Sequence, residues 1–418
     1  MTIRSTSRRY DRPHRPLPIL VANKAGKLLE HLGIRTDLDE ESLMEAARRK
    51  TGLADFGDNS FRGRMRILLE SVNDEARLHP LGRFLVRQNF IRLLVNRLRI
   101  EEAFKRNPEI DRQEIESPLF IVGLQRTGTT LLHRLLASDP GFRYLASWEA
   151  INPAPIPGKK NGGTDPRIRM AEIAQFSLKY LAPDFFAIHP IEARGPEEDC
   201  LLFDFSFWST VPEATQRVSR FSAWLEQQDY FEAYRDYKRI LKFLQFQNPQ
   251  GRWLLKTPQH LENLDSLLAV FPKAMIIQTH RDPVRTLASF CSMIAHSRGV
   301  FSDEIDTDEV GRHWLAKSIR MIQRSLAVRN QMPGVKIHDV SYHDLIADPI
   351  KEIRRIHRWL GKEISPELER KMNSFIKNNP QHKHGRHRYS LGDFGLDRQK
   401  VKDAFAEYCS RFEIPNED

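Results

Sequence analysis

The sequence predicts an α/β fold in which a parallel sheet is flanked by helices, with a helical extension at the N-terminus. Three observations support this prediction. Short apolar runs of strand length alternate with stretches of helical periodicity from about residue 118 onward. One of these runs passes through a glycine-rich turn directly into a helical pattern. The first 110 residues, by contrast, show helical periodicity only.

The N-terminal region is predicted to contain four helices. Residues 1 to about 17 are polar, basic and interrupted by prolines, which is typical of a loose arm. Helical patterns follow over residues 19–32, 39–50, 61–77 and 80–106. One apolar face of the last helix is marked by Phe84, Ile91, Leu94, Val95 and Leu98. We interpret residues 1–110 as a cap or as an element of homo-oligomer formation, and residues 111–418 as the domain that carries the chemistry.

Five strands are predicted in the second region. The first, residues 119–122, is wholly apolar, as expected of a strand that is buried on both faces. The others are expected near residues 144–146, 252–256, 274–278 and 335–340. Later helices are expected over residues 308–331, 342–347, 353–360 and 366–377. Buried strands alternating with helices in this way are typical of a parallel sheet.

A phosphate-binding loop is predicted between the first strand and the helix that follows it. The segment GLQRTGTT, residues 123–130, has the glycine spacing of such a loop, with Thr129 where nucleotide hydrolases carry lysine. The loop would turn backbone N–H groups and a helix N-terminus toward an anion. Arg126 adds a fixed charge and a planar fork of donors. Because the lysine is missing, we predict a site for one terminal phosphate-like group, without the magnesium that accompanies a β/γ-phosphate.

Composition narrows the class of function. The 418 residues are 40% hydrophobic and 29% charged, which is ordinary for a soluble globular protein. No apolar run approaches the roughly 20 residues needed to cross a bilayer, and the basic N-terminus lacks the apolar segment of a signal peptide. The formal net charge is +10, yet the sequence shows no nucleic-acid-binding module and no long basic run. An anionic cofactor therefore explains the basic excess better than nucleic acid does.

The cysteines and histidines do not form a recognisable metal site. Cys200, Cys291 and Cys409 are widely spaced, and their odd number makes no disulfide framework. Such cysteine usage suits a reducing cytoplasm. We therefore expect a cytoplasmic protein that works without a metal ion.

Three candidates for chemistry follow predicted strands, at the edge where ligands of open α/β sheets bind. Lys256 would emerge at the end of its strand and could place positive charge against a leaving group. His260, one helical turn later, could take a proton from a hydroxyl near neutral pH. Glu149 follows the strand near residues 144–146. The alternatives are a surface carboxylate for Glu149 and a capping or core histidine for His260.

Two segments resemble the cofactor-binding loops of sulfotransferases that use 3′-phosphoadenosine 5′-phosphosulfate (PAPS). The segment GLQRTGTTLL resembles their 5′-phosphosulfate loop. The second segment carries Arg281 at a strand end and Ser289 two turns into the next helix, and is similar to their 3′-phosphate site. Both loops occur in the family order, about 150 residues apart, which is more specific than either loop alone. The resemblance runs from about residue 118 to 396, and the N-terminal helices resemble only the longer bacterial members.

The resemblance implies a P-loop-NTPase-like sheet in a sulfotransferase domain over residues 111–418, with PAPS as donor and 3′,5′-adenosine bisphosphate (PAP) as product. It implies a base at either Glu149 or His260, and stabilisation of the leaving phosphate by Lys256 and Arg126. The implied cofactor-binding residues are Gln125, Arg126, Thr127, Gly128, Thr129, Thr130, Arg281 and Ser289, together with Lys383, Arg386, Arg388 and Tyr389 of a basic C-terminal segment. Gln125 stands where proline is common in the family.

The acceptor is not fixed by the sequence, because residues 153–250 resemble the family only loosely. A lipid alcohol, a sterol, a phenol or a sugar would all fit. Aromatic residues between 203 and 237 could line a pocket for a lipophilic alcohol or belong to the core. Two other functions stay open. An ATP-dependent small-molecule kinase would need magnesium, and a non-catalytic anion- or nucleotide-binding protein would tolerate replacement of Lys256.

Overall fold

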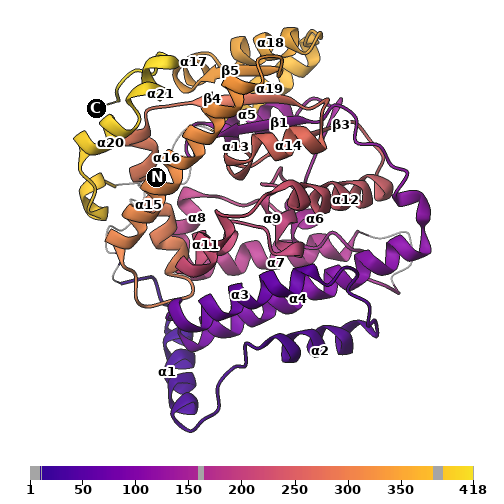
Figure 1. Cartoon of the computed structure of the whole chain (residues 1–418), viewed down its shortest axis with the longest axis vertical. Helices are drawn as coiled ribbons and strands as arrows, with labels where there is room; N and C mark the ends of the chain where they lie inside the picture. Colours follow the sequence, from indigo (N-terminus) through magenta and orange to yellow (C-terminus); the bar gives the residue numbers. More distant parts are fainter. Residues whose placement is uncertain (1–9, 11, 159–163, 380–388, 418) are drawn as a thin grey trace.

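Five parallel strands form one sheet in the order β2–β3–β1–β4–β5, in the upper part of Figure 1. The computed structural model describes residues 10, 12–158, 164–379 and 389–417. The strands are β1 (Leu119–Gly123), β2 (Phe142–Tyr144), β3 (Arg252–Lys256), β4 (Met275–His280) and β5 (Ile337–Ser341). The predicted fold class is therefore confirmed, and the strands lie within about two residues of the predicted positions.

The central strand β1 is buried on both faces, which explains its unbroken apolar sequence. Leu119 and Ile121 pack into a cluster with helices on one side of the sheet, whereas Phe120 and Val122 pack into a larger cluster on the other side. The first side is covered by α5 (Thr129–Leu136), α17 (Tyr342–Ala347), α18 (Pro349–Trp359) and α19 (Pro366–Asn378). The second side is covered chiefly by α12 (Phe231–Gln247), α13 (Gln259–Glu262), α14 (Leu264–Val270), α15 (Pro283–Arg298) and α16 (Thr307–Gln331).

The N-terminal region forms the four predicted helices. They are α1 (Leu17–His31), α2 (Glu40–Thr51), α3 (Ser60–Glu75) and α4 (Pro80–Arg106), followed by the short turn η1 (Pro108–Ile110). Phe84 is 47% exposed, contrary to its predicted place on the apolar face of α4, whereas Ile91, Leu94 and Leu98 of that face are buried. Phe61 and Phe90 both stack on Phe207. The hydrophobic core is thus continuous across residue 110, and the division of the chain there stays a prediction.

The remaining described helices lie in the segments between these elements and at the C-terminal end of the chain. They are α6 (Ser147–Ile151), α7 (Pro166–Leu181), α8 (Pro183–Ile188), α9 (Cys200–Phe203), η2 (Asp204–Ser206), α10 (Val211–Thr215), α11 (Ser219–Leu225), η3 (Leu391–Phe394), α20 (Arg398–Ala404) and α21 (Ala406–Arg411). The aromatic residues between 203 and 237 are mostly buried core, with Phe203 stacked on Tyr237. Within the described ranges, no helix is both long and apolar enough to cross a bilayer.

Candidate active site

The loop between β1 and α5 is shaped by two glycines. Gly123 has a φ of 150°, and a Cβ atom there would lie 2.4 Å from the hydroxyl oxygen of Thr279 on β4. Gly128 adopts a left-handed conformation, with φ 88°, and is the residue from which α5 begins. Thr127 is fully buried, and its hydroxyl lies 2.6 Å from the hydroxyl of Thr279. The loop is therefore fixed against β4 while the N-terminus of α5 faces the carboxyl edge of the sheet.

Arg126 links the phosphate loop to the second predicted loop. Its Nε donates to the hydroxyl of Ser289 (3.2 Å), and its Nη1 donates to the carbonyl of Ile188 (3.3 Å). Arg281 in turn donates from Nη1 to the carbonyl of Arg126 (3.1 Å). These contacts join positions 155 and 163 residues apart. They are possible because β1 and β4 are adjacent parallel strands, so that their following loops meet at one edge.

Arg281 and Arg285 form a basic corner beside this junction. The guanidinium of Arg281 lies 3.8 Å from the ring centroid of Tyr342. It donates hydrogen bonds to both carboxylate oxygens of Glu417, at 2.8 and 2.7 Å. One turn further along α15, Arg285 lies over the ring of Tyr389. Its Nε is buried and has no hydrogen-bond partner among the described residues. An unsatisfied guanidinium N–H beside a second arginine fits an anionic ligand.

Lys256 faces a carboxylate at the end of β3. It is 3% exposed, and its Nζ donates to Glu198 Oε1 at 2.6 Å. Burial disfavours the charge on Glu198, but the nearby cations Lys256 and Arg126 outweigh it and lower the pKa of Glu198. Burial lowers the pKa of His189 and so favours its neutral imidazole. Four ionisable groups thus gather where β1 and β3 end.

Glu198 follows Pro196 and Glu197, a pattern in which acidic residues usually stabilise a helix N-terminus. Glu198 instead lies in a segment that runs along the carboxyl edge of the sheet, where the backbone N–H of Asp199 donates to the Lys256 carbonyl (3.3 Å). Similarly, the N–H of Glu197 donates to the Leu145 carbonyl (2.8 Å). A run of acidic residues gave no indication of which carboxylate would meet the lysine, because the pairing depends on how this segment lies across β2 and β3.

The two predicted bases have structural partners. Glu149 accepts hydrogen bonds from Arg143 (3.2 Å) and from the backbone N–H of Ala146 (3.3 Å) at the start of α6. His260 has no exposed surface, and its ring nitrogens contact the Tyr234 hydroxyl (2.8 Å) and the Asp199 carboxylate (3.3 Å). These surroundings match the core histidine that the sequence left open as the alternative for His260. Glu149, at 7% exposed, is not the surface carboxylate of its own alternative, because it is buried at the start of α6. Whether either residue acts as the base stays a prediction.

The other predicted cofactor-binding residues are distributed along the same edge. Gln125 is half-buried against α15, Thr129 is buried at the start of α5, and Thr130 is exposed beside it. Lys383, Arg386 and Arg388 lie outside the described residues.

The family assignment follows from comparison with known proteins. The model of the Sulfotransferase family matches residues 118–366, which include both loops. The chain belongs to this sulfotransferase family. The sulfotransferase is similar in structure to STF1 from Mycobacterium tuberculosis H37Rv, with a TM-score of 0.78 and 33% identity over 89% of this chain and 100% of that one. It is also similar to sulfotransferase STF9 from Mycobacterium avium, with a TM-score of 0.82 and 27% identity over 91% of this chain and 98% of that one.

The sulfotransferase also has curated relatives in mycobacteria. It is 24% identical over 257 residues to the omega-hydroxy-beta-dihydromenaquinone-9 sulfotransferase Stf3 of Mycobacterium bovis and of Mycobacterium tuberculosis. The matched region covers 59% of this chain and 63% of those relatives.

Proposed function

We propose that this protein transfers a sulfuryl group from PAPS to the hydroxyl group of a lipophilic acceptor in the cytoplasm. The observation that carries the proposal is the meeting of the two loops at Arg126, which contacts both Ser289 and Arg281. A donor with a 5′-phosphosulfate and a 3′-phosphate needs anion-binding groups at two separate points of one site. The N-terminus of α5 supplies the first point and the corner of Arg281 and Arg285 supplies the second.

The donor fits the groups that are present. The 5′-phosphosulfate would bind the loop amides between Gly123 and Thr130, with Arg126 beside it. The 3′-phosphate would accept hydrogen bonds from Arg281 and Ser289, and from the Nε of Arg285 that lacks a partner among the described residues. We include Tyr389 in this site because it lies over Arg285. Lys383, Arg386 and Arg388 stay predictions from the family resemblance.

The transfer requires positive charge on the leaving phosphate and a proton acceptor for the incoming hydroxyl. In an in-line displacement, the acceptor oxygen forms a bond to sulfur while the bond from sulfur to the phosphate oxygen breaks. The positive charges of Lys256 and Arg126 would stabilise the negative charge that develops on the leaving phosphate. The products are the sulfate ester and PAP, and this chemistry needs no metal ion.

We propose Glu198 as the proton acceptor, ahead of Glu149 and His260. Glu198 is held by Lys256, and its lowered pKa keeps it ionised near neutral pH. As donor phosphate draws the Lys256 ammonium toward itself, a carboxylate oxygen of Glu198 would become free to accept the acceptor proton. Glu149 and His260 already make close contacts with Arg143 and Asp199 respectively, which supports an organising role for both.

A lipophilic acceptor is supported by two observations. The curated relatives are named for omega-hydroxy-beta-dihydromenaquinone-9, a hydroxylated menaquinone derivative. In this chain, the helix α8 that reaches Arg126 through Ile188 is preceded by α7, which has large exposed hydrophobic side chains. The aromatic residues between 203 and 237 do not contribute to this argument because they are mostly buried core.

The proposal is tested first by calorimetric titration with PAP and, separately, with magnesium and ATP. Tight binding of PAP that is lost in Arg281→Ala is expected. Preferential binding of magnesium and ATP would favour the kinase alternative and refute the proposal.

A turnover assay with PAPS and a long-chain primary alcohol tests the chemistry. Lys256→Met and Glu198→Gln should each lower kcat by about 10²-fold or more, as expected when a charge-stabilising or proton-accepting group is lost. Unchanged turnover in Glu198→Gln, together with a large loss of turnover in Glu149→Gln or His260→Ala, would show that Glu149 or His260 is the base and that Glu198 is not. A protein that binds PAP but shows no turnover would support the non-catalytic alternative.

A further inference from the structure

Two helices leave large hydrophobic side chains exposed. Leu17 on α1 and Phe176 on α7 are each 73% exposed, and within α1 only Asn23 is buried. The exposed set comprises Leu17, Leu20, Val21, Leu28, Leu29, Leu32 and Ile34 at α1, and Met170, Ile173, Phe176 and Tyr180 on α7. We name this set the apolar band. Exposed patches of this kind on a soluble protein mark interaction surfaces.

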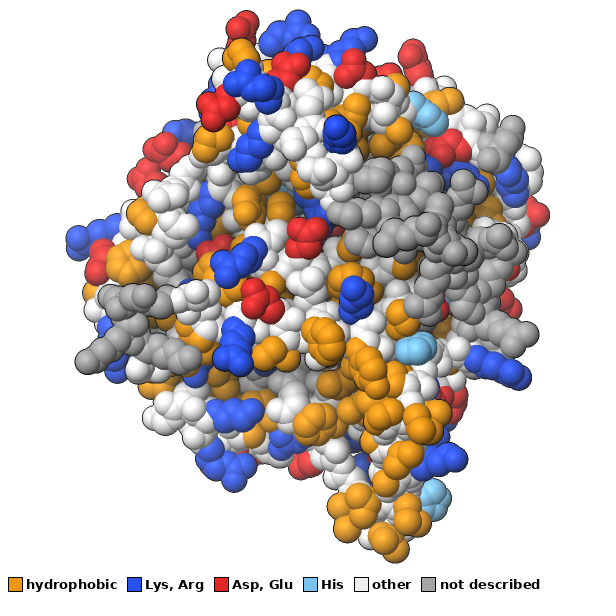
Figure 2. Space-filling view, turned by 180° about the vertical axis from the view of Figure 1, so that it is seen from behind, with side chains coloured by type: hydrophobic (Ala, Val, Ile, Leu, Met, Phe, Trp, Pro, Cys, Tyr) orange, Lys and Arg blue, Asp and Glu red, His pale blue; other side chains and the backbone are white. Residues whose placement is uncertain are grey.

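The apolar band lies on one face of the molecule. Figure 2 shows hydrophobic side chains gathered from the middle of that face down to the projecting part at its lower right, which is α1. On α7 the four residues recur at intervals of three and four, so that they form one stripe along the helix. The band is therefore a continuous surface and not a scatter of single residues.

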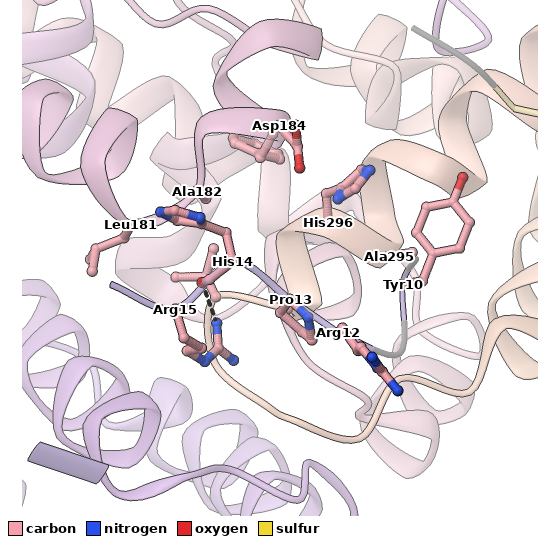
Figure 3. Close-up of a pocket in the computed structure, with 13 residues that line it drawn as sticks. Tyr10, Arg12, Pro13, His14, Arg15, Leu181, Ala182, Asp184, Ala295 and His296 are labelled. Carbon is pink, nitrogen blue, oxygen red and sulfur yellow. Dashed lines mark hydrogen bonds between the residues drawn. The ribbon is translucent and has the colours of Figure 1, made fainter. Parts of the chain in front are cut away.

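The apolar band leads toward the proposed transfer site. Leu181 at the end of α7, Ala182 between the helices and Phe185 in α8 line a pocket together with residues 12–15. Figure 3 shows Leu181 and Ala182 beside residues 12–15. Residues 12–15 continue directly into α1, where the band begins. From this pocket α8 runs to Ile188, whose carbonyl accepts the hydrogen bond from Arg126. The short helix α8 thus connects the apolar band with the phosphate loop.

The charges around the apolar band are predominantly positive. Its two helices and their flanks expose five basic residues, Lys24, Lys27, Arg35, Arg169 and Lys179. The acidic residues within the two helices are Glu30 and Glu172, and each has an arginine within 4 Å, namely Arg35 at 3.9 Å and Arg194 at 3.8 Å. In the surroundings, Asp165 is paired with Arg167 at 2.7 Å, Asp303 lies 3.7 Å from Lys27, and Asp184 follows α7. A cationic rim around an apolar face is suited to anionic lipid headgroups. A second copy of the chain would instead bring the same positive rim against itself.

We propose that α1 and α7 dock on the surface of an anionic membrane, with the apolar band in the boundary between headgroups and acyl chains. Docking would bring the transfer site to the level at which the hydroxyl of a membrane-dissolved lipid alcohol emerges. This inference rests on the proposed function for the identity of the acceptor. The docking itself requires neither donor nor turnover, so the two proposals fail separately.

The test is sedimentation of the full chain with vesicles, without donor or acceptor. Binding is expected to vesicles of phosphatidylcholine mixed with phosphatidylglycerol, to be weaker with phosphatidylcholine alone, and to fall as salt is added. The double variant Leu28→Ser, Phe176→Ser should lower the partition coefficient by about tenfold or more, because two large side chains no longer enter the lipid. Phe231→Ser, a matched change at an exposed aromatic residue of α12, should leave it unchanged.

Three outcomes would overturn the inference. They are absence of vesicle binding, equal binding by the double variant and the wild type, and a stable dimer in light scattering that the double variant converts to monomer. The last result would identify the apolar band as a subunit interface. PAP titration of the double variant serves as a folding control, since its affinity should equal that of the wild type. The proposed function is judged separately, by PAP binding and turnover with a detergent-solubilised alcohol.

Discussion

Glu417 holds the guanidinium that we propose for the 3′-phosphate, so replacing it should change donor affinity in a defined direction. Both carboxylate oxygens of Glu417 accept hydrogen bonds from Arg281, at 2.8 and 2.7 Å. Each side chain is 15% exposed. Burial disfavours the charge on Glu417, but Arg281 outweighs it and lowers the pKa of Glu417. Glu417 is therefore ionised near neutral pH and competes with any phosphate for the same fork.

The size of the effect follows from this competition. A hydrogen bond to a charged group contributes about 1.5–3 kcal/mol. To bind Arg281, the 3′-phosphate must displace the carboxylate of Glu417 and so break one such interaction. Glu417→Gln keeps the shape and one acceptor oxygen but removes the charge. Loss of about 1.4 kcal/mol of competition would raise the affinity for PAP by about tenfold. Adenosine 5′-phosphate, which has no 3′-phosphate, should gain little.

The assay is calorimetric titration of wild type and Glu417→Gln with both nucleotides. Glu413→Gln changes an exposed glutamate of the same C-terminal segment and is the matched control, for which no gain is expected. An unchanged or weaker affinity of Glu417→Gln for PAP would refute the reasoning. Equal gains for PAP and adenosine 5′-phosphate would show that the carboxylate acts on the whole nucleotide and not on the 3′-phosphate.

Three further predictions concern the loop, the donor site and stability. Gly123→Ala should lower the melting temperature and PAP affinity together, because its Cβ would lie 2.4 Å from Thr279 Oγ1; a variant that matches the wild type in both would contradict this. Ser289→Ala should weaken PAP binding by about fivefold, the value of roughly one neutral hydrogen bond, without affecting adenosine 5′-phosphate in the same titration. Burial opposes the charge on Glu213, but Lys317 and a nearby histidine lower its pKa from 4.5 to about 2. This folded-state pKa lies below the unfolded value, so the stabilisation is present above pH 4.5 and is lost as pH falls toward 2. Glu213→Gln should therefore cost about 3 kcal/mol at pH 7 in urea unfolding, and a difference from wild type that persists at pH 2 would contradict the assignment.

The sequence by itself determined the sheet, the two loops and the family resemblance. The apolar run of β1 and the glycine spacing after it are local requirements, because burial on both faces and a left-handed turn each restrict the residues at particular positions. Arg281 and Ser289 were recognisable for the same reason, since they lie at fixed distances along one strand and helix. Their joint role could be expected because parallel strands bring their carboxyl ends to one edge.

Only the tertiary structure decided which charged groups face one another. The pairing of Lys256 with Glu198, the full burial of His260 and the hold of Glu417 on Arg281 depend on how segments far apart in the chain cross the carboxyl edge of the sheet. No periodicity encodes such contacts, because they follow from packing between elements and not from the residues within one of them. The exposure of α1 and α7 has the same origin. The sequence shows that α1 and α7 contain apolar residues, but it does not show which of them are buried. In the folded chain other helices form the core, and many apolar side chains of α1 and α7 stay exposed.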